Sequence, residues 1–147
     1  MARWWMAVLL AACAVGGSSA CKQQQAATPA GPTGPATTDN FSGTLTLDNM
    51  GSIAHHFAIS FAGDSDLDVK LTGIAPNTSL TLAVGIGTWN SSASTCAVQS
   101  NYSTVALNQT LPLRVPAANE YCVQVSVSAN VIIVLGPVDY TIQTVHY

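Results

Sequence analysis

Charged side chains are scarce in this sequence. Of its 147 residues only 7% are charged, with 4 basic and 7 acidic side chains and a formal net charge of −3. A chain this poor in Lys and Arg has no basic patch, which argues against binding to nucleic acid and against electrostatic attachment to anionic lipid. Its surface must be built instead from Ser, Thr, Asn and Gln.

Recognisable catalytic motifs are also missing. The sequence has no G-x-S-x-G elbow, no H-E-x-x-H zinc motif and no glycine-rich phosphate loop. Paired catalytic carboxylates would have to come from Asp64, Asp66, Asp68 and Asp139, and nothing in their spacing places two of them across a cleft. We therefore expect neither an enzyme nor a cofactor. A hydrolase of envelope polymers is the less favoured alternative.

No apolar run after the N-terminal region is long enough to span a membrane. In that region, Arg3 precedes an apolar stretch at residues 4–15, which is followed by small residues and Cys21. This layout resembles the export signal of a bacterial lipoprotein, with a signal peptide at residues 1–20 and Cys21 as the acylated first residue of the mature chain. The acyl chains would then anchor the protein to a membrane.

Two other interpretations of the N-terminus stay open. Leu10 lies three places before Cys13, which is the usual lipoprotein spacing, whereas Ser18 occupies that place before Cys21. Cleavage before Cys13 would leave a very short apolar segment and an extra thiol in an oxidising compartment, so cysteine parity favours Cys21. An ordinary secretory signal would be cut at the same bond and would leave Cys21 without lipid.

Residues 21–40 are rich in Gln, Thr, Pro and Gly and contain no large apolar side chain. Such a segment cannot bury enough surface to offset the entropy of ordering it, so we expect a disordered tether. The folded domain is expected at residues 41–147. Lys22, rather than the Asp that retains enteric lipoproteins in the inner membrane, follows Cys21. The resemblance therefore implies a position in the outer membrane if the source is Gram-negative.

The remaining residues alternate between apolar and polar side chains. This period of two, interrupted by turn signals rich in Gly, Pro and Asn, predicts short β-strands with one buried face each. The side chains expected on the buried faces include Leu45, Ile53, His55, Phe57, Ile59, Leu67, Val69, Leu71, Leu82, Val84, Ile86, Leu111, Val115, Tyr121, Val123, Val125, Tyr140 and Ile142. No segment of the mature chain shows a helical period, so we expect an all-β fold, a single antiparallel β-sandwich of jelly-roll or Greek-key type.

Four segments, in this order, resemble the bacterial pre-peptidase C-terminal domain, a small β-sandwich. They are G-T-L at 43–45, D-S-D-L-D-V-K-L at 64–71, N-E-Y-C-V-Q-V-S-V at 119–127 and V-D-Y-T-I-Q-T-V-H-Y at 138–147, with a strand that ends in H-H-F at 55–57 between the first two. The chain departs from the pattern at Asn119, where the family prefers Gly. In that family the domain is an accessory module of secreted proteases. Because no catalytic domain is attached here, the resemblance implies a binding or accessory role without naming a target.

Cys96 and Cys122 are the cysteines that remain if Cys21 carries lipid and Cys13 is removed with the signal. In an exported domain, two such cysteines are expected to form a disulfide. A disulfide between them would close a loop of about 26 residues, and the chain-entropy model predicts that this stabilises the folded state by about 3.5 kcal/mol. A metal site is disfavoured because the two cysteines are far apart and no His lies near them.

Histidine and aspartate offer weaker metal candidates. His55 and His56 are adjacent, so on a strand they point to opposite faces and cannot easily bind one ion. Asp64, Asp66 and Asp68 supply the oxygen ligands that calcium prefers, but the Gly and Glu of an EF-hand loop are absent. We expect Asp66 and Asp68 on the solvent face of a strand, Asp64 in a turn, and no metal.

Two further features suggest binding surfaces. Trp89 and Tyr102, expected in loops, could form an aromatic platform for a sugar. A run of five apolar residues exceeds what a strand with one solvated face needs, so it predicts either a fully covered strand or, as we favour, the main interaction surface. That run consists of Val131, Ile132, Ile133, Val134 and Leu135.

These patterns together predict a lipid-anchored, extracytoplasmic β-sandwich with a binding, accessory or structural role at the bacterial cell envelope. Its expected partners are the membrane, through the N-terminal lipid, and an envelope protein or polysaccharide. A carbohydrate- or cell-wall-binding module is the alternative function.

Overall fold

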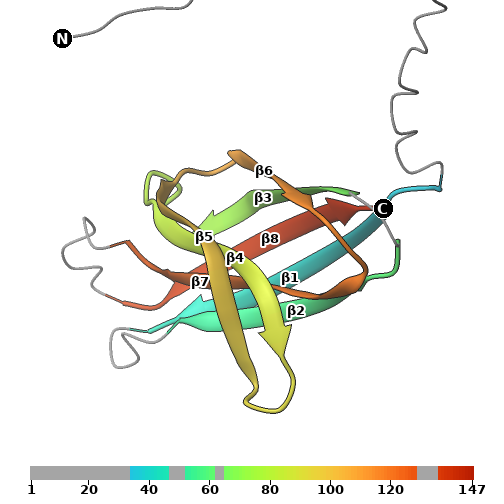
Figure 1. Ribbon diagram of the computed structural model, residues 1–147. Helices are drawn as coiled ribbons and strands as arrows, with labels where there is room; N and C mark the ends of the chain where they lie inside the picture. Colours follow the sequence, from blue (N-terminus) through green and yellow to red (C-terminus); the bar gives the residue numbers. More distant parts are fainter. Residues whose placement is uncertain (1–33, 47–51, 62–64, 129–135) are drawn as a thin grey trace, which may run out of the picture.

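The computed structural model describes residues 34–46, 52–61, 65–128 and 136–147, which form eight β-strands (Figure 1). Within these residues, no helix is long and apolar enough to cross a bilayer. The strands are β1 (Thr37–Leu45), β2 (Ile53–Ile59), β3 (Ser65–Ala75), β4 (Leu82–Asn90), β5 (Thr95–Val105), β6 (Thr110–Val115), β7 (Asn119–Val127) and β8 (Val138–His146).

The strands form two four-stranded antiparallel sheets. The first sheet has the order β1-β8-β3-β6 and the second has the order β2-β7-β4-β5. Most consecutive strands lie in different sheets, and this alternation gives the strand order of a jelly roll. The predicted all-β sandwich is therefore confirmed, and its topology is the jelly-roll form.

The core lies between the two sheets and follows the predicted alternation. In β3, Leu67, Val69 and Leu71 are buried, while Asp66 and Asp68, which alternate with them, are exposed. β8 follows the same rule, whereas β4 and β7 are also buried on their outer face, at Gly85, Gly87 and Cys122. Burying one aliphatic side chain contributes about 1.5–3 kcal/mol. The predicted core is confirmed, with partial burial at its edges.

β1 begins at Thr37, so its first four residues lie within the segment expected to be a tether, residues 21–40. These residues have no large apolar side chain, but they pair with β8 along their whole length. A side-chain contact adds to the pairing, because Asp39 Oδ2 lies 3.0 Å from His146 Nε2. Backbone pairing with a distant strand leaves no apolar pattern in the sequence, so the strand begins earlier than the apolar residues indicate.

β5 was not predicted as a strand. It lies at the edge of the second sheet and pairs with β4 alone, and among its residues only Val105 is buried. An edge strand that is mostly exposed on both faces does not need alternating apolar residues. The sequence signal on which the other strands depend is therefore missing here.

Candidate binding face on the second sheet

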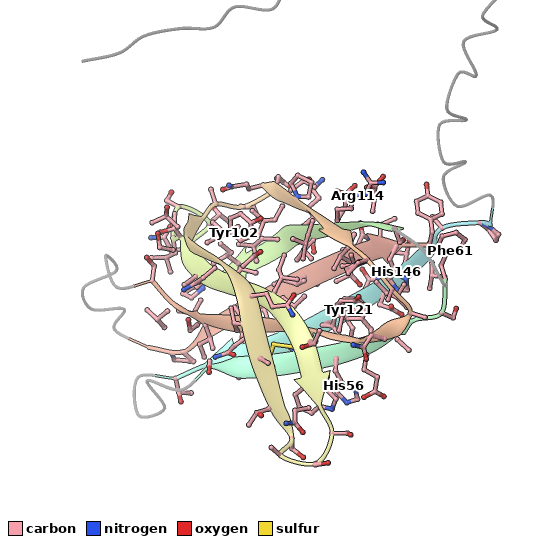
Figure 2. All side chains as sticks on the ribbon, in the orientation of Figure 1. His56, Phe61, Tyr102, Arg114, Tyr121 and His146 are labelled. Atoms are coloured by element: carbon pink, nitrogen blue, oxygen red, sulfur yellow. A yellow bond between two sulfur atoms is a disulfide. The ribbon has the colours of Figure 1, made fainter. Side chains whose placement is uncertain are left out.

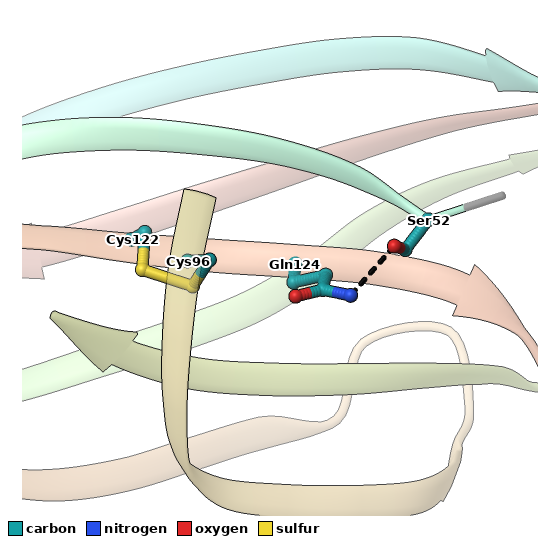
Figure 3. The surroundings of a disulfide bond; sticks show 4 residues. All are labelled: Ser52, Cys96, Cys122 and Gln124. Carbon is teal, nitrogen blue, oxygen red and sulfur yellow. Dashed lines mark hydrogen bonds between the residues drawn. A yellow bond between two sulfur atoms is a disulfide. The ribbon is translucent and has the colours of Figure 1, made fainter. Parts of the chain in front are cut away.

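β5 leaves the plane of its sheet and folds across the outer surface of β4. Cys96 in β5 is bridged to Cys122 in β7, with Cα atoms 5.8 Å apart, although β4 lies between these strands (Figure 3). In a flat sheet, two strands separated by a third lie roughly 9.5 Å apart. The predicted disulfide is confirmed, and it holds β5 against β7 over the intervening strand.

Two glycines of β4 make room for this crossing. A Cβ atom on Gly87 would collide with the backbone carbonyl oxygen of Ala97 and would lie 2.8 Å from the Cα atom of Val98. On Gly85, it would lie 2.9 Å from both methyl carbons of Val98. Because backbone atoms cannot swing away as a side chain can, the crossing requires glycine at position 87.

His56 and Trp89 stack on the outer surface beside the disulfide. Their ring centroids are 4.6 Å apart and the rings are nearly parallel, at 6°. His56 is directly opposite Cys122 in the β2–β7 pairing, and Trp89 is directly opposite Cys96 in the β4–β5 pairing. The ring pair and the disulfide are therefore neighbours, and Figure 2 shows His56 beside the end of the β4–β5 hairpin.

A small hollow of about 140 Å³ lies on the same surface. Its lining residues are all uncharged and come from β4, β5 and β7; they are Gly85, Val98, Asn101, Gln124 and Ser126. Gln124 Nε2 donates a hydrogen bond to Ser52 Oγ at 2.6 Å (Figure 3). We call the combination of the His56–Trp89 ring pair, the Cys96–Cys122 bridge and this hollow the hairpin face.

His55 points the opposite way, into the space between the sheets, as predicted from its position next to His56. Its Nε2 atom lies 2.9 Å from the Tyr140 hydroxyl, and its ring stacks on Phe41 with centroids 5.0 Å apart. Burial lowers the pKa of His55 from its usual 6.5 and raises the pKa of Tyr140 to about 12. Both shifts favour the neutral side chains, so this contact is a hydrogen bond within the packed interior.

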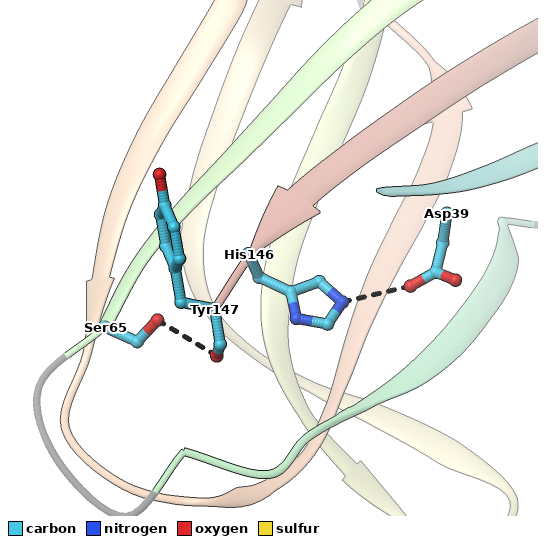
Figure 4. Close-up of polar contacts among 4 residues, drawn as sticks. All are labelled: Asp39, Ser65, His146 and Tyr147. Atoms are coloured by element: carbon cyan, nitrogen blue, oxygen red, sulfur yellow. Dashed lines mark hydrogen bonds and ion pairs between the residues drawn. The ribbon is translucent and has the colours of Figure 1, made fainter. Parts of the chain in front are cut away.

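His146 and Asp39 form a second polar pair, at the end of the first sheet (Figure 4). His146 is only 3% exposed. In a nucleophile–His–carboxylate site, one ring nitrogen contacts the carboxylate and the other contacts the nucleophile. Here the other nitrogen, Nδ1, is buried and has no hydrogen-bond partner in the described part of the chain. The pair therefore links β1 to β8 and does not activate a nucleophile there.

The metal candidates do not converge. Within the described ranges, no group of three or more His, Cys, Asp and Glu side chains is placed to hold a metal ion. Asp66 and Asp68 lie on the exposed face of β3, on the outside of the first sheet. Asp64 lies outside the described residues.

The structure corrects the expected placement of Trp89 and Tyr102, while their role in binding a sugar stays a prediction. Both residues lie on strands and not in loops, and Tyr102 packs against the core while Trp89 stacks on His56 outside it. Gly87, two residues before Trp89, is needed where β5 crosses β4 and does not mark a turn. The partner of Trp89 was missed because no local pattern connects it with His56.

The apolar run expected to be the main interaction surface lies outside the described residues. Its role therefore stays a prediction for Val131, Ile132, Ile133, Val134 and Leu135.

No family model matches the chain and no curated protein matches it, so the resemblance to the pre-peptidase C-terminal domain stays a prediction. Among solved structures, the chain is similar to the crystal structure of Aeromonas hydrophila PliG, a periplasmic lysozyme inhibitor of g-type lysozyme. The identity is 15%, the match covers 76% of this chain and 88% of that chain, and the TM-score is 0.42. Because the identity and the TM-score are this low, the similarity assigns no activity to this chain.

Proposed function

We propose that this chain is a lipid-anchored, extracytoplasmic binding domain, and that its hairpin face contacts a component of the cell envelope. The observation that carries the proposal is the Cys96–Cys122 bridge, which fixes β5 across the outside of the second sheet. Disulfides of this kind persist in oxidising compartments, in agreement with the export signal before Cys21. The same bridge also shapes the surface that we assign to binding.

The tether suits a domain held near a membrane. Acylated Cys21 would be followed by residues 22–36 before β1 begins at Thr37. Fully extended, these residues reach at most about 50 Å, so the domain would stay close to the surface of the membrane while remaining free to turn. A domain in that position meets envelope polymers and proteins at high local concentration.

The hairpin face is suited to binding because it is ordered before a partner arrives. The disulfide fixes one side of the β4–β5 hairpin, and the stacking of Trp89 on His56 fixes the end of β4. In the turn of the hairpin, Asn90 Oδ1 accepts a hydrogen bond from the Ala93 backbone N–H at 3.1 Å. A surface whose side chains are already fixed loses less entropy on binding.

Binding of isolated envelope fragments tests this role. The purified chain carrying Cys21→Ala, which cannot be acylated at that position, should sediment with the fragments. Trp89→Ala in the same background should weaken binding at least about tenfold, because aromatic residues on ordered surfaces often dominate affinity.

Tyr147→Ala is the matched control for this experiment. Tyr147 is an aromatic residue that is 39% exposed, whereas Trp89 is half-buried, and Tyr147 lies at the end of the first sheet. Its removal should leave sedimentation unchanged. If Trp89→Ala binds as well as the parent chain, or if both variants lose binding equally, the hairpin face is not the binding surface.

A further inference from the structure

We propose that the hollow in the hairpin face binds uncharged saccharide units of an envelope polymer. This inference rests on the proposed binding function and names the class of ligand. The hollow is lined by backbone and side chains of three strands, so its shape depends on the crossing of β5 over β4.

The charge of the lining excludes ionic ligands. All of the lining residues are uncharged. Two titratable side chains lie on this face outside the lining: Glu120 is four positions before Gln124, roughly 13 Å away along β7, and His56 is on β2, opposite Cys122. A phosphate, carboxylate or ammonium group placed in the hollow would lose hydration without gaining an opposite charge, which is costly. Hydroxyl and amide groups do not carry that penalty.

The hydrogen-bonding groups match a polyol. Gln124 uses its Nε2 atom toward Ser52, and its Oε1 atom accepts no hydrogen bond within the described part of the chain. The side chains of Asn101 and Ser126 likewise bond to none of the described residues. Amide and hydroxyl groups both donate and accept, as the hydroxyls of a sugar do. Val98, 40% exposed, supplies an apolar wall for the C–H face of a sugar ring.

The size of the hollow limits what enters it. The volume of the hollow is about 140 Å³. Pockets that enclose a drug-sized ligand are larger, about 300–1,000 Å³. The hollow therefore takes one sugar unit or its substituents, and the rest of the polymer would lie along the open sheet surface toward Trp89.

A protein partner fits this surface less well. In the described part of the chain, the large apolar side chains that are exposed are Val98 and Tyr147. Protein interfaces usually centre on a cluster of buried aromatic and other apolar anchors, and this face has no such cluster among its described residues. The polar, uncharged surface favours the saccharide.

Nuclear magnetic resonance of the isotope-labelled, full-length mature chain in detergent micelles tests the assignment. Chitotetraose and cellotetraose are the uncharged probes, and a heparin tetrasaccharide is the charged one. We expect an uncharged probe to shift the backbone amide signals of Gly85, Val98 and Gln124, and we expect added salt to leave this binding unchanged. Asn101→Ala and Ser126→Ala should each weaken it roughly 2- to 10-fold, whereas Thr104→Ala, an exposed position on β5 outside the hollow, should not.

Three outcomes would overturn the saccharide assignment: no shift with either uncharged probe, a response to heparin alone, or shifts confined to other surfaces. Sedimentation with envelope fragments distinguishes a wrong ligand class from a wrong binding role. If envelope fragments still bind in a Trp89-dependent way while the oligosaccharides do not, the ligand class is wrong and the binding role stands. If the Trp89→Ala chain sediments like its parent, the binding role itself is wrong.

Discussion

Replacing both bridged cysteines, as Cys96→Ala with Cys122→Ala, is expected to lower the free energy of unfolding by about 2–5 kcal/mol. The bridge closes a loop with a sequence separation of 26, and removing it restores conformational freedom mainly to the unfolded chain. It also releases β5, an edge strand that pairs with β4 and with no other strand among the described residues. Denaturant unfolding followed by tryptophan fluorescence measures the change.

Reduction of the parent protein is the control for this double variant. A parent chain whose disulfide has been reduced should unfold at nearly the same denaturant concentration as the variant, because both lack the same cross-link. If the double variant loses less than about 1 kcal/mol of unfolding free energy, β5 is held across the sheet by other contacts. So small a loss is below the range expected for removal of a native disulfide.

Gly87→Ala is the second substitution with a large expected effect. The added Cβ would occupy the position of the Ala97 carbonyl oxygen, so the chain must move β5 away from β4. Overpacking of this kind costs typically 1–3 kcal/mol. The displacement should also hinder pairing of Cys96 with Cys122, so alkylation of the purified variant should reveal free thiols.

Gly34→Ala controls for the general effect of replacing glycine, because a Cβ there has no atom within 4 Å among those described. This variant should match the parent in its free energy of unfolding and in the fraction of molecules with the Cys96–Cys122 disulfide formed. A Gly87→Ala protein that is fully oxidised and as stable as the parent would show that β5 does not cross β4 as closely as the structure has it.

The core and the disulfide could be predicted because each has a strong signal in the sequence. Burying one side of a strand imposes a period of two, as in Leu67, Val69 and Leu71, and cysteine parity selected Cys96 and Cys122. These signals depend on composition and local spacing, which a single sequence displays directly.

The hairpin face could not be predicted in the same way. β5 lacks an apolar period because it is an exposed edge strand, and its path depends on glycines that look like turn residues in the sequence. The stacking of Trp89 on His56 joins strands that are distant in the sequence. Such features arise from how the sheet bends, so only the three-dimensional arrangement shows them.

We propose that the chain is an exported, lipid-anchored domain, and its outer face is fixed by a disulfide. Mass spectrometry of the protein extracted from membranes, alkylated without prior reduction, tests it most directly. We expect an N-terminal peptide that begins at Cys21 and carries two or three acyl chains, together with a Cys96 peptide linked to the Cys122 peptide. An unmodified Cys21, an N-terminus at Cys13, or alkylated thiols at both Cys96 and Cys122 would contradict it.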